Sequence, residues 1–140
     1  MDSFPIELDR YFFTRLCVVS NRLHVQKEQL TAERLSGPES ALAVAPIEGE
    51  DRLFLATQTV KLEAEGKPDY PYSVDIECVG FFRVVEDGMS TDKQQAGVTM
   101  VAHSVLYAAC REAVLNATGR QAWGPFTLGL SVLQGKAESD

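Results

Sequence analysis

A stretch that is almost free of charge, residues 94–134, constrains the fold of this chain more than any other feature. Its charged side chains are Arg111, Glu112 and Arg120, whereas the whole chain of 140 residues has a formal net charge of −7. Because a large apolar surface is rarely left in water, this stretch must be covered by the rest of the fold or by a partner. Polar residues divide it into apolar runs shorter than about 18 residues, the length that a membrane-spanning helix needs, so we expect no membrane insertion.

Residues 92–118 of this stretch predict one long helix. The segment lacks proline and is rich in alanine, valine and leucine, and Thr91 or Asp92 would cap its start. Its apolar positions form two stripes, one of which includes Val101 and Val105, so that most of the circumference is apolar. A sheet covers only one side of such a helix. We therefore predict a homo-oligomer with Val101 and Val105 in the interface between subunits.

Four segments ahead of the helix predict β-strands. They are residues 10–20, 40–47, 52–65 and 70–85. Apolar and polar residues alternate in the third and fourth segments, as in strands with one buried face. The turn between these two segments is short, which predicts an antiparallel hairpin. The order of elements predicts a single α+β domain over residues 1–140, with a four-stranded antiparallel sheet and the long helix packed on one face.

Proline and glycine make the strand predictions more specific. Pro46 confines the second strand to an edge or a bulge, because proline has no N–H to donate within a sheet. Gly80 coincides with a shift in the alternation of the fourth strand, which predicts a β-bulge or a strong twist there.

The chain shows no catalytic, metal-binding or cofactor-binding motif. His24 and His103 are its histidines, and Cys17, Cys78 and Cys110 are too widely spaced for a C-x-x-C pair. It has no glycine-rich nucleotide-binding loop, and its acidic charge argues against nucleic-acid binding. We therefore expect a non-enzyme without metal or cofactor. The cysteine usage and an N-terminus without a signal-peptide pattern predict a cytoplasmic protein.

Three short motifs occur along the chain in a set order. Tyr11-Phe-Phe-Thr14 comes first, Gly80-Phe-Phe-Arg-Val84 follows, and Leu106-Tyr-Ala-Ala-Cys-Arg-Glu-Ala-Val114 lies in the predicted helix. They are similar to the aromatic first strand, the end of the fourth strand and the helix motif of one family, in which an arginine-glutamate pair matches Arg111 and Glu112. The chain thus resembles the SecB family of bacterial export chaperones.

The resemblance implies the same sheet and helix, assembled as a homotetramer that is a dimer of dimers. It implies binding of unfolded polypeptides without ATP and their delivery to the translocation motor SecA. Relatives in the family serve as chaperones of toxin–antitoxin systems. The resemblance also implies a subunit contact through alternate residues of the fourth strand, which here are Tyr72, Val74, Ile76 and Cys78.

The chain departs from the family pattern in three places, one of which is Thr127-Leu-Gly-Leu-Ser-Val132, which lacks the family's proline-valine-asparagine-phenylalanine ending. Ala108-Ala109 replaces a proline-tyrosine pair, and because the chain ends at Asp140, we expect the family's second helix to be absent or vestigial. In the family, that helix covers part of the client groove, and the tail contributes to motor binding and to the tetramer. Binding of SecA and the choice between a dimer and a tetramer therefore stay open. Residues 135–140 are expected to form a flexible tail.

The leading hypothesis is a cytoplasmic, ATP-independent holdase chaperone that binds unfolded clients, such as preproteins or antitoxins, in an apolar groove. The predicted client contacts are Phe12, Phe81, Phe82, Trp123 and Phe126. The alternative is a non-catalytic adaptor or structural subunit with the same fold, dedicated to one protein partner. A holdase would prevent the aggregation of several unrelated denatured proteins, whereas an adaptor would bind one partner.

Overall fold

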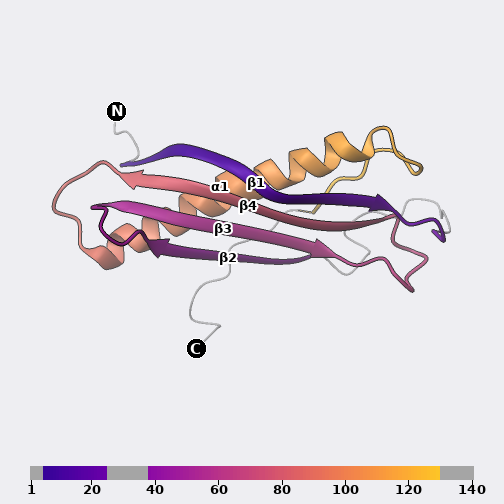
Figure 1. Cartoon of the computed structure of the whole chain (residues 1–140), viewed down its shortest axis with the longest axis horizontal. Coiled ribbons are helices and arrows are strands. Elements are labelled where there is room, and N and C mark those ends of the chain that lie inside the picture. The colour runs from indigo at the N-terminus through magenta and orange to yellow at the C-terminus, as the bar shows by residue number, and fades with distance from the viewer. Residues whose placement is uncertain (1–4, 25–37, 130–140) are drawn as a thin grey trace.

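Four strands and one helix follow one another along the chain in the predicted order (Figure 1). The computed structural model describes residues 5–24 and 38–129. Its elements are β1 (Ile6–Ser20), β2 (Glu39–Pro46), β3 (Leu53–Leu62), β4 (Tyr72–Val84) and α1 (Thr91–Thr118). The α+β class is confirmed, and β1 begins at Ile6 instead of at residue 10. The expected tail, residues 135–140, lies outside the described residues.

The strands form one antiparallel sheet in the order β1-β4-β3-β2. β3 and β4 form the predicted hairpin, with Val60 opposite Ile76. β2, which ends at Pro46, lies at one edge of the sheet, as its proline predicted. β1 forms the other edge. Among the described strands it pairs with β4 alone, so one side of its backbone faces away from the sheet.

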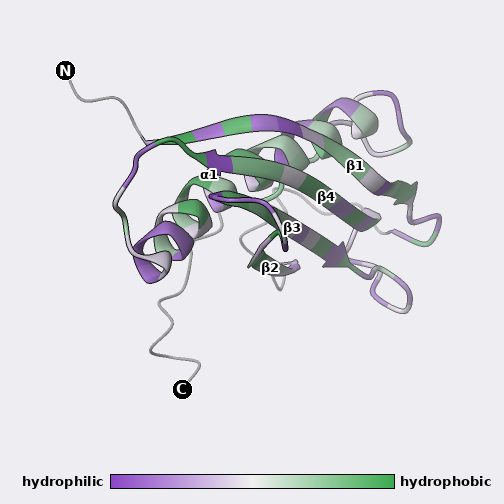
Figure 2. Cartoon of the chain, turned by 60° about the vertical axis from the view of Figure 1, so that its left-hand side comes forward, coloured by the Kyte–Doolittle hydropathy of each residue, from purple (hydrophilic) through white to green (hydrophobic). Residues whose placement is uncertain are grey.

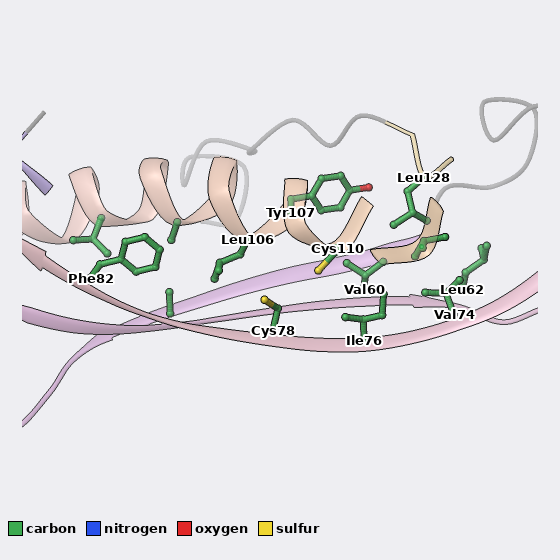
Figure 3. Close-up of a cluster of buried hydrophobic side chains, with 14 of the residues drawn as sticks. Val60, Leu62, Val74, Ile76, Cys78, Phe82, Leu106, Tyr107, Cys110 and Leu128 are labelled. Carbon is green, nitrogen blue, oxygen red and sulfur yellow. The ribbon is translucent and has the colours of Figure 1, made fainter. Parts of the chain in front are cut away.

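The core lies between the sheet and α1, which runs across one of its faces (Figures 1 and 2). β4 buries every second residue there: Tyr72, Val74, Ile76, Cys78, Gly80, Phe82 and Val84. α1 covers this face with side chains spaced four residues apart: Val98, Ala102, Leu106, Cys110 and Val114 (Figure 3). Residues four apart lie on the same side of a helix, so one row is enough to cover the sheet.

The segment that follows α1, residues 119–129, covers a second side of the helix. Leu128 is fully buried, and its carbonyl accepts a hydrogen bond from Arg111 Nε (3.0 Å). The Tyr107 hydroxyl donates to the carbonyl of Gly129 (2.8 Å), and burial raises the pKa of this phenol. Part of the cover that the sequence assigned to a second subunit is therefore supplied by the chain itself.

Neither of the two apolar stripes predicted for the helix is buried along its whole length, and the buried row takes Val98 from one stripe and Leu106, Cys110 and Val114 from the other. Val101 and Val105 are only partly buried, and Met100 is 62% exposed. Val101 and Val105 pack against the edge of the core and keep part of their surface accessible, whereas Met100 lies outside the core contacts. Val101 and Val105 are thus accessible enough to contribute to an interface.

The bulge predicted at Gly80 is wrong. β4 keeps its alternation through this residue, and the register shifts lie in β1, between Leu8 and Arg10 and between Phe13 and Arg15. Gly80 instead allows the helix to approach the sheet. A Cβ atom there would lie 2.8 Å from Cε1 of Phe82 and 3.1 Å from Cδ2 of Leu106.

The start of α1 also differs from the prediction. The N-cap is Ser90 rather than Thr91 or Asp92, and its side chain accepts a hydrogen bond from the Lys93 N–H (3.3 Å).

α1 is long and apolar enough to meet a weak criterion for a membrane-crossing helix. The core helix of a soluble protein meets the same criterion. In this fold α1 is packed against the sheet.

Candidate functional site

β1 displays large apolar side chains on both faces. It carries five of the nine exposed large apolar side chains in the described part of the chain: Leu8, Tyr11, Phe12, Leu16 and Val19. Hydrophobic bands recur along this strand in Figure 2. An exposed apolar edge strand marks a binding surface, because its side chains and its unpaired backbone both favour association.

Three of these side chains form a row on the side of β1 that faces α1. Leu8, Tyr11 and Leu16 lie opposite Phe82, Gly80 and Ile76 of β4, which point toward the helix. Directly paired residues share a face of the sheet. At this edge α1 covers the sheet only in part, so the row is 37%, 43% and 49% exposed, respectively. We call these three residues the inner-edge row.

On the opposite face, two of the predicted client contacts lie together. The rings of Phe12 and Phe81 have centroids 6.2 Å apart, and Arg10 places its guanidinium carbon 5.0 Å and 5.6 Å from the two centroids. Such cation–π contacts stabilise the arrangement by roughly 0.5–1 kcal/mol each at an exposed site. We call Arg10, Phe12 and Phe81 the outer-face cluster.

Polar pairs lie beside the outer-face cluster. Arg83 contacts Asp9 (3.4 Å), and farther along the strands Arg15 contacts Asp75 (2.9 Å). Exposed ion pairs of this kind contribute little stability, but they surround the apolar rings with a hydrated rim. An aromatic and arginine centre inside a polar rim has the composition of a protein-binding hot spot.

Trp123 is held at the far end of β1. Its indole Nε1 donates a hydrogen bond to the carbonyl of Asn21 (2.9 Å), and its backbone N–H donates to the hydroxyl of Tyr72 (3.1 Å). The same hydroxyl donates to the carbonyl of Gly124 (2.7 Å), and the ring of His24 lies edge-on to the indole at 5.0 Å. These contacts fix Trp123 to its own chain.

Phe126 also has partners within the fold. Its ring lies 5.9 Å from that of Tyr72, and its N–H donates to Thr118 Oγ1 (2.9 Å). Asn21, the residue that Trp123 contacts, lies about 30 Å from Phe12 along the direction of β1, because a strand extends by about 3.3 Å per residue. The predicted aromatic set therefore divides into two separate sites.

Five predicted site residues belong to the core instead. Phe82, which was assigned to client binding, and Tyr72, Val74, Ile76 and Cys78, which were assigned to the subunit contact, are each 0% or 1% exposed. Val74, Ile76, Cys78 and Phe82 belong to the core between the sheet and α1, and Tyr72 contacts the segment that follows α1. The assignment of these five residues to intermolecular contacts is therefore wrong, because no second molecule reaches side chains that are buried within their own chain.

The inner-edge row is the part of the surface that sequence reasoning missed. Its residues lie in a segment whose apolar residues fall on both faces, so the alternation predicted no single buried face.

Among the described residues, no three or more histidine, cysteine, aspartate or glutamate side chains gather where they could hold a metal ion.

Comparison with known proteins adds the fold family. No described protein family and no curated protein matches the sequence. The SecB-like chaperone Rv1957 of Mycobacterium tuberculosis, in complex with a ChAD peptide from the HigA1 antitoxin Rv1956, is 20% identical over 91% of this chain and 88% of its own, with a TM-score of 0.64. A Streptococcus agalactiae protein of unknown function is 11% identical over 92% of this chain and 100% of its own, with a TM-score of 0.56. The chain therefore has the fold of a SecB-like chaperone.

Proposed function

We propose that this chain is a divergent SecB-like holdase chaperone, which binds unfolded or partly folded segments of other proteins in the cytoplasm without ATP. The observation that carries the proposal is the apolar display of β1, an edge strand with exposed side chains on both faces. A stably folded monomer gains nothing from such an edge, which natural proteins usually blunt. A protein that binds extended chains requires one.

The outer-face cluster is the proposed centre of client binding. An apolar client side chain that packs on Phe12 and Phe81 gains about 25 cal/mol for each Å² of apolar surface that it removes from water. The unpaired backbone of β1 offers main-chain hydrogen bonds to an extended segment, as in β-strand addition. Trp123 and Phe126 form a second, more rigid contact at the other end of the strand.

Self-association is proposed through the inner-edge row together with Val101 and Val105. All five side chains lie on the α1 side of the sheet or on α1 itself, and each keeps accessible surface. The proposed subunit contact therefore lies at the sheet edge and the helix flank rather than under the helix. The assembly would contain two or four copies, which light scattering of the purified protein distinguishes.

The client class is suggested by the complex of Rv1957, which holds a peptide from an antitoxin. A preprotein for delivery to SecA is the other client of a SecB-like chaperone. An adaptor dedicated to one partner would use the same surfaces. Binding of several unrelated unfolded proteins supports the holdase, whereas binding of a single partner supports the adaptor.

The test is suppression of aggregation. The purified chain is mixed at stoichiometric ratio, without ATP, with denatured luciferase and with reduced, unfolded lysozyme, and light scattering is followed. The chain should suppress both signals. The double variant Phe12→Ala, Phe81→Ala should need about 10-fold more protein for half suppression, because two hot-spot anchors are lost.

The matched control is Leu115→Ala, which removes an exposed leucine of α1 outside the proposed surfaces. It should behave like the unmodified chain. A double variant that remains folded by circular dichroism and keeps full activity would remove the outer-face cluster from the proposal. If Trp123→Ala and Phe126→Ala leave client binding unchanged, these two residues are not a second client contact.

A further inference from the structure

Two cysteines face one another in the core where α1 crosses β4. Cys78 lies on β4 and Cys110 on α1, and both are free thiols that are 0% exposed. Their sulfur atoms point toward each other across the helix–sheet interface in Figure 3. Cys17, the third cysteine, is exposed on β1.

The contact makes the two sulfur atoms chemically different. The neighbouring Cys110 side chain lowers the pKa of Cys78 against the opposing effect of burial. The same contact, together with burial, raises the pKa of Cys110. Cys78 is therefore the better nucleophile of the pair, because the thiolate is the reactive form.

We propose that Cys78 and Cys110 form a redox modification site, at which an oxidant of the peroxide class closes a disulfide bond between β4 and α1. The Cys78 thiolate attacks one peroxide oxygen, which forms a sulfenic acid and releases the other oxygen as water after it gains a proton. The sulfur of Cys110 then attacks the sulfenic sulfur, its thiol proton leaves with the hydroxyl as a second water, and the S–S bond forms. In sum, two thiols and one hydrogen peroxide give one disulfide and two waters.

The fold sets both the rate and the consequence of this step. Because neither sulfur is exposed, peroxide reaches the pair only through a local opening of the surrounding core, so oxidation is slow compared with that of exposed Cys17. Bond formation requires the sulfur atoms to approach to about 2.05 Å, which moves the helix closer to β4. The bond closes the loop between residues 78 and 110, and it leaves the outer-face cluster on the other side of the sheet unchanged.

The experiment uses the Cys17→Ser variant, so that intermolecular disulfides of Cys17 do not interfere. The folded protein is incubated with hydrogen peroxide and analysed by intact-mass spectrometry and tryptic mapping. We expect the loss of two hydrogen atoms, a cross-linked peptide pair containing Cys78 and Cys110, and a melting temperature raised by about 5–10 °C. Dithiothreitol should reverse all three changes.

Two controls keep the proposal falsifiable. Cys17→Ser, Cys110→Ala, checked for folding by circular dichroism, should show no such mass loss and no peroxide-dependent rise in melting temperature. The unmodified chain, in which Cys17 reacts, shows that the peroxide dose is sufficient. The proposal is overturned if both buried thiols stay open to alkylation after that dose, or if the disulfide forms in urea but not in the folded protein.

Discussion

A single hydroxyl group, that of Tyr72, connects the buried face of β4 to the segment after α1. It accepts a hydrogen bond from the Trp123 N–H (3.1 Å) and donates one to the Gly124 carbonyl (2.7 Å), while the ring is fully buried. Burial raises the pKa of this phenol, so it stays protonated and able to donate. The position of Trp123 therefore depends on a residue distant from it in sequence.

Tyr72→Phe should destabilise the protein by about 1–3 kcal/mol, because it leaves the Trp123 N–H and the Gly124 carbonyl without their partner. Urea unfolding measures the loss, and the fluorescence of Trp123 should shift to longer wavelength as its segment loosens. Tyr11→Phe is the matched control, since it removes the same group from a ring that is 43% exposed. It should change stability by less than about 0.5 kcal/mol. Equal effects of the two variants would contradict this role of Tyr72.

The contact between α1 and β4 depends on how closely the two elements approach. Gly80 lies where Leu106 of the helix meets the ring of Phe82, and both side chains are fully buried. A side chain at Gly80 would occupy space that these two already fill. The glycine is therefore required by packing rather than by an unusual backbone conformation.

Gly80→Ala should lower the free energy of unfolding by about 1–3 kcal/mol, the usual cost of adding an atom group to a filled core. Thermal or urea unfolding provides the measurement. Gly129→Ala is the control, because a Cβ atom there meets no atom within 4 Å. Its effect should stay within about 0.5 kcal/mol. A neutral Gly80→Ala variant would mean that Phe82 and Leu106 have room to shift.

On the scale of the whole molecule, charge and apolar surface have separate roles. A net charge of −7 favours solubility of a chain with exposed apolar side chains on β1, and in the proposed function it would attract basic segments of a client. The apolar contacts on β1 are insensitive to the sign of a client's charge. The two contributions differ in their response to salt.

For a basic, apolar client peptide, the dissociation constant should rise about 3–10-fold between roughly 50 and 500 mM NaCl, because salt screens the attraction between exposed charges. A neutral peptide of the same length and apolar content should change by less than about 2-fold. Fluorescence anisotropy of labelled peptides gives both values. The same salt response for both peptides would show that net charge has no part in client choice.

Much of the fold could be predicted from the sequence because its signals are local. Alternation identified Tyr72, Val74, Ile76 and Cys78 as one face of a strand, and Pro46 placed β2 at an edge. Two of the predicted client contacts, Phe12 and Phe81, are neighbours on an accessible face. Alternation shows which side chains share a face, but not whether a helix of the same chain or a second subunit covers that face.

The sequence by itself determined the order of the elements and the apolar character of α1, since both follow from residues a few positions apart. Only the tertiary structure decided which of these surfaces remain exposed. The order β1-β4-β3-β2 leaves β1 at an edge that α1 covers in part, while the segment after α1 closes another side of the helix. Exposure depends on contacts between residues far apart in the chain. For that reason Phe82 is buried in the core and Leu16, with the same apolar character, lies on the surface.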